Sequence, residues 1–396
     1  MQITCTEELH LSGGPGEFYL GRAEALMPTL LAAYEGKVQL IYLDPPFGTG
    51  DTFRVRVNAG NRTVALPAFT DTMTKPQYLR WMKKILTGCK KLLSPTGSIY
   101  LHIDYRMNGP MRALMDDVFG STNFMNEIIW CYRSGGRSKN YFPRKHDNIL
   151  FYRKSRKTFF SIDAVGVPRG RERRNHMKKV VDEWGRVGYS IRSGGKTYTY
   201  YEDSLIYPSD VWTDIEHLQQ KDSERVGYAT QKPEALLERI IKASSQPGDL
   251  VADLFSGSGT TASAAAKLGR RFLAVDASPF AMYVLRARRL LGEAGGSLLD
   301  APKHLKLIYP AGKDTPKLSY AAVTLDGRKY VEVTEAAFDE TYPPAYLALG
   351  TIKNGCFYPL YVDCQPVLPF RCPMDKVAHP VLQLVDALGR QAFYEL

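Results

Sequence analysis

Residues 37–50 read Lys37-Val38-Gln39-Leu40-Ile41-Tyr42-Leu43-Asp44-Pro45-Pro46-Phe47-Gly48-Thr49-Gly50. The mostly apolar run Val38–Leu43 predicts a buried strand, because a strand covered on both faces carries continuous apolar residues. Neither proline can donate a ladder hydrogen bond, and each fixes its own φ at about −65°. The strand therefore ends at Asp44 in a stiff turn. The carboxylate, the fixed carbonyl oxygen of Pro45 and the ring of Phe47 suit a flat ring that bears an amino group. An ordinary loop start is the alternative interpretation of this turn.

The composition indicates a globular chain of two or three domains. Its 396 residues fit that estimate, and a hydrophobic content of 44% is enough for a sizeable core. No run approaches the roughly 18 to 20 apolar residues of a membrane span. The N-terminus lacks the basic start and apolar run of a signal peptide, and six cysteines over this length do not suggest a disulfide framework. We therefore expect a cytoplasmic protein with no membrane partner.

The positive charge is concentrated in one segment. The net charge is +11, and residues 131–200 alone hold 18 Lys and Arg against 5 Asp and Glu. The same segment is rich in Tyr, Phe, Gly and Asn, which favours nucleic-acid contact over a merely solvated face. We expect phosphate contacts from the basic residues that follow Tyr132, namely Arg133, Arg137, Lys139, Arg144 and Lys145.

Strands and helices alternate through the first 152 residues. Strands are expected at 18–20, 38–43, 98–104, 127–132 and 148–152, and helices at 23–34, about 75–92 and 109–119. Thr74 is the expected N-cap of the second helix. Residues 51–70 are expected to form a polar loop or a hairpin that could act as a mobile lid. The alternation predicts an α/β sheet with helices on both faces.

Periodicity weakens from Arg133 to Gly227 and then returns. Helices are expected after Pro233, at 262–268 and at 279–291, with strands at 250–255 and 271–276. The predicted domains are therefore two halves of one α/β domain at 1–152 and 228–300, an inserted target-recognition region at 153–227, and a small β-rich C-terminal domain at 301–396. The sequence does not decide whether that last domain serves dimer formation or DNA binding.

A second motif lies between the strands at 250–255 and 271–276. The turn reads Ser256-Gly257-Ser258-Gly259-Thr260-Thr261, with Asp253 before it and Asp276 at the end of the next strand. The glycines allow the backbone to approach a ligand closely, and an acid about twenty residues on can accept both ribose hydroxyls. No Gly-Lys-Ser/Thr of a P-loop and no third glycine of a dinucleotide site follows. The pattern predicts a nucleoside-cofactor site.

These motifs resemble those of DNA amino-methyltransferases. Residues 253–261 resemble the motif that binds S-adenosyl-L-methionine (AdoMet), residues 44–47 the catalytic motif, and residues 230–234 the helix start that precedes the AdoMet motif. A catalytic motif, a basic insert and then an AdoMet motif is the order of the β class. Residues 37–50 and 127–155 are most similar to the modification (Mod) subunits of type III restriction-modification systems and their solitary relatives. The resemblance covers about residues 17–292 and implies a Rossmann-like AdoMet-dependent methyltransferase fold.

The resemblance assigns roles to particular residues. It implies that Asp44, Pro45, Pro46 and Phe47 are catalytic, and that AdoMet is held by Asp253, Phe255, Gly257, Gly259, Thr260, Asp276, Gln231 and Lys232. Lys232 is expected to meet the methionine carboxylate, with a solvated lysine at a helix end as the alternative. The chain departs from the family at two positions, since Arg22 stands where an acid usually follows the glycine, and Phe47 where Tyr is more frequent.

The implied substrate is double-stranded DNA, with adenine N6 of a flipped base as the methyl acceptor. Asp44 favours adenine, because related cytosine-N4 enzymes often carry Ser there. A cytosine-N4 enzyme, a non-catalytic DNA-recognition subunit and an RNA amino-methyltransferase are the alternatives. A homodimer, a separate restriction subunit and nucleoid association are left open.

Two further groups of residues are interpreted as structural. His102 and Asp104 end a predicted strand near the expected pocket, where a structural histidine is preferred. Cys356, Cys364, Cys372 and His379 have near-regular spacing, but no Cys-x-x-Cys pair supports zinc. No metal is expected.

Overall fold

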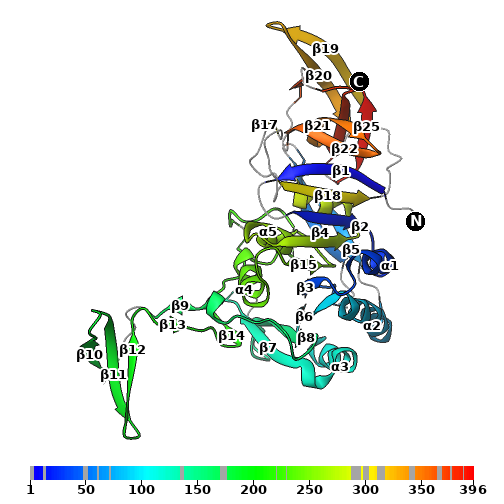
Figure 1. Ribbon diagram of the computed structural model, residues 1–396. Coiled ribbons are helices and arrows are strands. Elements are labelled where there is room, and N and C mark those ends of the chain that lie inside the picture. Colours follow the sequence, from blue (N-terminus) through cyan, green and yellow to red (C-terminus); the bar gives the residue numbers. More distant parts are fainter. Residues whose placement is uncertain are drawn as a thin grey trace.

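A long central sheet organises the molecule (Figure 1). The computed structural model describes residues 4–11, 15–47, 52–59, 62–70, 73–133, 138–169, 176–219, 221–228, 230–286, 296–297, 303–309, 317–338, 344–363, 368–374, 377–386 and 388–396. The strand order is β14-β7-β8-β6-β3-β15-β16-β2-β18-β1-β22-β21-β24-β25, with β17 paired to β22.

The parallel part of the sheet carries the predicted motifs. It contains β6 (Leu93–Ile103), β3 (Val38–Leu43), β15 (Leu250–Asp253), β16 (Arg271–Asp276), β2 (Gly16–Leu20) and β18 (Lys303–Tyr309). β3 and β15 are neighbours although about two hundred residues separate them in the sequence. From this pair the chain continues outward on opposite sides, β3 to β6 and β15 to β16, which creates a topological switch point.

Helices cover both faces of the sheet, as the alternation predicts. α1 (Ala23–Tyr34), α2 (Lys75–Leu92) and α3 (Asn108–Phe119) pack on one face, and α4 (Glu234–Ser244), α5 (Thr260–Lys267) and α6 (Pro279–Tyr283) on the other (Figure 1). β3 shows why the strand is apolar throughout, because Leu40 and Tyr42 belong to the α4–α5 core and Ile41 and Leu43 to the α1–α3 core.

On the side of β6, the sheet continues through two antiparallel pairings and ends in a short strand that pairs parallel with β7. β8 (His146–Arg153) pairs with β6 and with β7 (Phe124–Cys131), and β14 (Val211–Trp212) closes this edge beside β7. A single 3-10 turn, η1 (Ser121–Asn123), precedes β7. The loop from β7 to β8 therefore begins at the same end of the sheet as Asp44.

The inserted segment extends away from the body (Figure 1). It contains η2 (Asp163–Val165), a pair formed by β9 (Val167–Pro168) and β13 (Leu205–Ile206), and a three-stranded arm of β10 (Lys178–Val181), β11 (Val187–Ser193) and β12 (Lys196–Tyr201). The predicted hairpin is also present, as β4 (Thr52–Ala59) and β5 (Arg62–Thr70), which pair antiparallel. Its role as a lid remains a prediction.

The C-terminal strands continue the central sheet. β1 (Thr4–Leu11) pairs with β18, and β22 (Cys356–Asp363), β21 (Pro344–Lys353), β24 (Val381–Asp386) and β25 (Gln391–Glu395) extend it, with β17 (Gly296–Ser297) on β22. A second sheet contains β19 (Lys317–Leu325), β20 (Arg328–Ala337) and β23 (Phe370–Pro373). This region is β-rich as predicted, although β18 joins it to the main sheet.

Element boundaries differ from the predictions at a few places. β6 begins at Leu93 rather than at residue 98, and β15 ends at Asp253, so that the Leu254–Phe255 pair belongs to the following turn. The helix predicted at 279–291 is α6 followed by a π-helical turn at 284–286, and residues 287–291 lie outside the described residues.

Candidate active site

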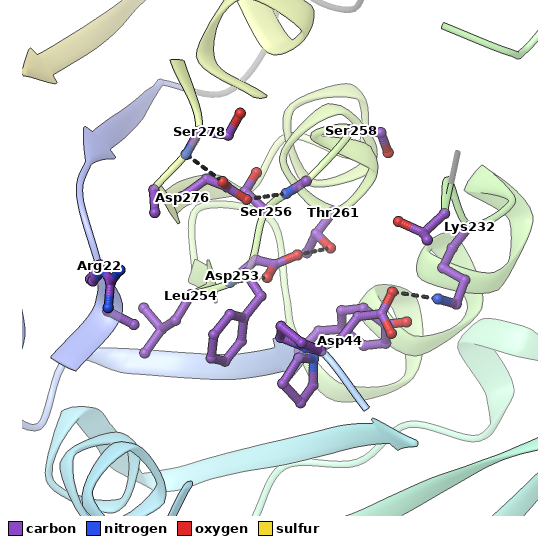
Figure 2. Close-up of a pocket in the computed structure, with 18 of the residues that line it drawn as sticks. Arg22, Asp44, Lys232, Asp253, Leu254, Ser256, Ser258, Thr261, Asp276 and Ser278 are labelled. Atoms are coloured by element: carbon purple, nitrogen blue, oxygen red, sulfur yellow. Dashed lines mark hydrogen bonds and ion pairs between the residues drawn. The ribbon is translucent and has the colours of Figure 1, made fainter. Parts of the chain in front are cut away.

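Three carboxylates meet at the carboxyl ends of adjacent parallel strands. Asp44 follows β3, Asp253 ends β15 and Asp276 ends β16. Ligands of open α/β sheets bind at this edge beside the switch point. A cavity of about 450 Å³ lies there (Figure 2), a size typical of small-molecule sites.

Most of the predicted site residues line this cavity. Those on its wall are Asp44, Pro45, Pro46, Phe47, Lys232, Asp253, Phe255, Gly257, Thr260 and Asp276. Gly259 and Gln231 are not part of the wall. Gln231 is buried, and its amide accepts from Val226 N–H at 2.9 Å and donates to the Glu224 carbonyl at 2.7 Å, so that it braces the segment before α4.

The glycine turn is shaped by two left-handed residues. Gly257 has φ of 49° and Gly259, the N-cap of α5, has φ of 75°. A Cβ on Gly259 would stand 2.6 Å from Leu285 Cδ1. Gly259 therefore lies behind the cavity wall, at a point of the turn that has no room for a side chain. This position explains why Gly259, a predicted cofactor residue, does not face the cavity.

Asp276 holds the glycine turn in place. Its two oxygens accept from Gly257 N–H and Ser278 N–H, each at 2.8 Å. Burial raises the pKa of Asp276 above its ordinary value, against these hydrogen bonds, which lower it. The carboxylate thus fixes the conformation of the glycine turn.

Asp253 is the most deeply placed acid of the three. Burial raises its pKa to about 7, although Thr261 Oγ1 and Phe255 N–H donate to it at 2.6 and 2.9 Å and lower that pKa in part. The charges of Asp44 and Asp276 add to the increase. A cationic ligand in the cavity would therefore be attracted more strongly when Asp253 is ionised than when it is protonated.

Lys232 forms an ion pair with Asp44 (Figure 2). The ammonium comes from just before α4, lies 5.8 Å from the centre of the Phe47 ring, and both charged side chains are largely shielded from solvent. Thr260 Oγ1 donates to the Lys232 carbonyl at 3.3 Å, which ties this lysine to the start of α5. The pair joins the two predicted halves of the site.

A buried polar network lies behind Phe47. Burial raises the pKa of Tyr42 well above its ordinary value, and its hydroxyl forms a hydrogen bond with His102 Nδ1 at 2.8 Å. His102 Nε2–H then donates to Asp147 at 3.1 Å, and Tyr132 donates to the other oxygen at 3.2 Å. Burial acts to raise the pKa of Asp147, but these bonds and the charge of Lys232 lower it overall. His102 is fully buried, as a structural histidine would be.

The described geometry agrees with the match of this chain to a known family. Residues 38–286 match the family described as DNA methylase, N6_N4_Mtase. The chain belongs to this family. It is a family of AdoMet-dependent DNA amino-methyltransferases, and the β-class order of motifs is present. The narrower resemblance to type III Mod subunits is not confirmed.

Individual relatives match between 60% and 71% of this chain. The chain is 30% identical over 304 residues to the type II methyltransferase M.EcaI of Enterobacter cloacae, a match that covers 65% of this chain and 66%, just under two thirds, of that protein. It is 28% identical over 243 residues to the DNA adenine methyltransferase YhdJ of Escherichia coli, covering 60% of this chain and 71% of the relative. The solved PvuII DNA methyltransferase (cytosine-N4-specific) aligns with a TM-score of 0.47 and 15% identity, over 71% of this chain and 88% of that one.

Several wall residues of the cavity were not predicted from the sequence. Tyr78 and Trp81 enter from α2, and Trp81 packs edge-on against Phe255 with ring centres 5.6 Å apart. Their spacing of three residues on a helix was the available signal. Trp81 Nε1 and Ser256 Oγ are buried on the cavity wall and have no hydrogen-bond partner among the described residues, which suits a polar ligand.

The N-terminal segment also contributes to the wall. Gly21, Arg22, Ala23 and Glu24 all line the cavity. The departure from the family at Arg22 therefore stands at the pocket itself, and Arg22 lies 4.0 Å from the carboxylate of Glu24. The chain thus carries an acidic side chain, Glu24, two positions after the position at which the family usually has an acid.

The predicted phosphate-binding residues lie in the loop between β7 and β8. Arg133, Lys139 and Arg144 are exposed, and Lys145 is half-buried, with its ammonium donating to the Arg133 carbonyl at 3.2 Å. Arg133 also lies 3.4 Å from Glu216, which offsets part of its charge. Arg137 lies outside the described residues.

The remaining cysteines and histidine lie in the C-terminal strands. Cys356 is on β22, Cys372 is on β23, His379 precedes β24, and Cys364 lies outside the described residues. No cluster of three metal-binding side chains occurs within the part of the chain that the structure describes. In the same part, no helix has the length and apolar character needed to cross a membrane.

Proposed function

We propose that this chain is an AdoMet-dependent, site-specific DNA methyltransferase that methylates N6 of adenine. The observation that carries the proposal is the single cavity shared by Asp44-Pro45-Pro46-Phe47 and the Gly257–Asp276 half. One set of residues suits an amino-bearing ring and the other a nucleoside, and methyl transfer requires the two ligands to meet.

The nucleoside half fits AdoMet. Asp276 would accept the ribose hydroxyls, the buried Asp253 would face the positive charge of the cofactor, and Phe255 with Trp81 would supply apolar contact. AdoMet supplies an activated methyl group, whose bond to sulfur breaks as the amino nitrogen bonds to the carbon, leaving a neutral thioether.

The catalytic half positions the acceptor. The Asp44 carboxylate and the Pro45 carbonyl would each accept one amino hydrogen, which favours a tetrahedral nitrogen whose lone pair points at the methyl group. The proton lost from nitrogen goes to Asp44 or to solvent. A base inside a duplex cannot reach this cavity, so it is flipped out. Phe47 would hold the flipped ring by stacking, an interaction worth about 1–3 kcal/mol.

Lys232 must leave Asp44 before this arrangement forms. An ammonium on the carboxylate occupies an acceptor that the amino group needs, and its charge opposes the positive charge that develops on the attacking nitrogen. We propose that Lys232 turns to the methionine carboxylate when the cofactor is bound. Cofactor binding would then precede productive capture of the base.

Adenine is favoured over cytosine by two observations. Asp44 stands where related cytosine-N4 enzymes often carry Ser, and one relative, YhdJ, is described as a DNA adenine methyltransferase. The alternative is methylation of cytosine N4, since the family includes enzymes of both kinds. Double-stranded DNA is the proposed partner, and a nucleoid location follows from it. A homodimer and a separate restriction subunit stay predictions.

The test is to sequence methylated bases in DNA from cells that express the protein and to analyse nucleoside digests by mass spectrometry. We expect N6-methyladenine at one recognition sequence, absent from cells that express Asp44→Ala. If N4-methylcytosine is the only methylated base in the digest, the methyl acceptor is cytosine N4 and the assignment to adenine is wrong. Methylation of RNA with none of DNA would refute the proposal.

A further inference from the structure

One apolar side chain of the β7–β8 loop stands almost completely in solvent. Phe142, in the β7–β8 loop, is 95% exposed, and its neighbours Tyr141 and Tyr105 are also exposed. A scattered surface residue needs no explanation, but a cluster of exposed aromatics marks an interaction site. None of these three rings lines the cavity.

The loop holds Phe142 on a firm support. The Arg144 guanidinium lies over both tyrosines, 4.2 Å from the ring centre of Tyr105 and 4.6 Å from that of Tyr141. Pro143 follows Phe142 directly, which restricts the Phe142 backbone to extended conformations. Phe142 is thus presented outward by a braced segment rather than by a loose one.

Hydrogen bonds connect this loop to the catalytic half of the cavity. Tyr132 donates its backbone N–H to the Lys145 carbonyl at 2.9 Å and its hydroxyl to Asp147 at 3.2 Å. The positive charge of Lys232, which is paired with Asp44, lowers the pKa of Asp147. The loop is therefore linked through Tyr132 and Asp147 to the Asp44 half of the cavity.

We infer that Phe142 is the wedge that enters the DNA stack and fills the space left by the flipped base. The inference rests on the proposed function. Removing a base from a duplex exposes the faces of its two neighbours and leaves its partner unpaired. An aromatic ring can stack on those faces whatever the sequence, so Phe142 would stabilise the flipped state without reading bases.

The charge around Phe142 favours DNA over a second copy of the chain. Arg133, Lys139, Arg144 and Lys145 belong to the same loop as Phe142, and DNA phosphates complement their charge. Two copies that joined through this loop would bring two such sets of positive groups together at one interface. We therefore assign the cluster to the nucleic acid.

The test compares Phe142→Ala with the full-length wild type in single-turnover methylation. The substrates are two duplexes with the mapped recognition sequence, in which the target base is either paired or opposite an abasic site. We expect Phe142→Ala to reduce the rate about tenfold or more on the paired duplex and little on the abasic one, where flipping is already easy. Phe142→Trp should retain most of the rate on both.

Tyr320→Ala is the matched control, because this aromatic residue is 44% exposed on β19, outside both the basic segment and the inserted region. It should leave the ratio of the two rates unchanged. An equal rate decrease of Phe142→Ala on both duplexes, no decrease on either, or a change in oligomeric state in place of the rate effect would each overturn the wedge. If the wild type methylates no duplex, the proposed function fails instead, and the two failures are distinguishable.

Discussion

Asp253 should make cofactor binding depend on pH. Its folded pKa of about 7 lies above the value near 3.9 of a free Asp side chain, so the protonated form persists to neutral pH. AdoMet is cationic and favours the ionised form, so its affinity should rise with pH through about 7 and then level off. Between pH 8 and pH 6 we expect a decrease in affinity of about tenfold by calorimetry.

Asp253→Asn removes the titrating group and is the control for that measurement. The variant should bind AdoMet more weakly than the wild type at pH 8 but with little change between pH 6 and pH 8. An equally steep pH profile in Asp253→Asn would assign the effect to another group.

Lys232→Gln tests the proposed move of this lysine between two carboxylates. Removal of a charge-assisted hydrogen bond of about 1.5–3 kcal/mol predicts AdoMet binding weakened tenfold or more. 5′-Methylthioadenosine lacks the methionine carboxylate, so it should bind wild type and variant equally. Lys267→Gln, which removes a lysine paired with Glu234 outside the cavity wall, is the control. Equal weakening for both ligands would contradict the role given to Lys232.

At the scale of residues, the sequence identifies groups whose chemistry is carried by a short motif. Asp44 and Asp276 follow from strand ends and turn composition. The pairing of Lys232 with Asp44 could not be predicted, because 188 positions separate them in the sequence and they meet only in the folded chain. Trp81 was overlooked because a helix predicted at about 75–92 does not by itself show which of its side chains face a cavity.

At the scale of elements, the turn from β15 to α5 depends on the absence of a side chain at Gly259. Gly259→Ala would combine strain at a φ of 75° with the clash at Leu285 Cδ1, and should reduce both the free energy of unfolding in urea and AdoMet affinity. Gly36→Ala is the control, since Gly36 has φ of 70° and nothing within 4 Å of an added Cβ. It should cost about 1–2 kcal/mol and leave AdoMet binding intact. Similar effects of both variants would contradict the packing argument.

Regular elements were predicted well where an apolar run has a clear polar residue or turn at each end. β3, α1 and β16 have the predicted bounds, because apolar runs and flanking polar residues define both ends. β14 and β18 could not be predicted from local pattern, since each joins the sheet through pairing with a strand distant in sequence. The insert was predicted only as a region, because short exposed strands such as β10 show no hydrophobic period.

At the scale of the whole molecule, the concentrated positive charge should govern DNA affinity. Replacing Lys139, Arg144 and Lys145 with Ala should weaken binding to all sequences and reduce the slope of log K against log salt by about 0.9 for each DNA phosphate that the variant no longer neutralises. Fluorescence anisotropy over a salt series measures this slope. The control replaces Lys83, Lys84 and Lys91 of α2 with Ala, an equal change in charge on another face. A similar slope change in both variants would remove the loop from the interface.

The central claim is that one cavity contains two separable halves, one for the cofactor and one for the base. The most direct test measures AdoMet binding and methyl transfer to DNA side by side in Asp44→Ala and Asp276→Ala. We predict that Asp44→Ala binds AdoMet at least as tightly as the wild type, since Lys232 is freed, yet transfers no methyl group. Asp276→Ala should lose AdoMet binding and, with it, transfer. Wild-type transfer by Asp44→Ala, or wild-type AdoMet binding by Asp276→Ala, would contradict the account.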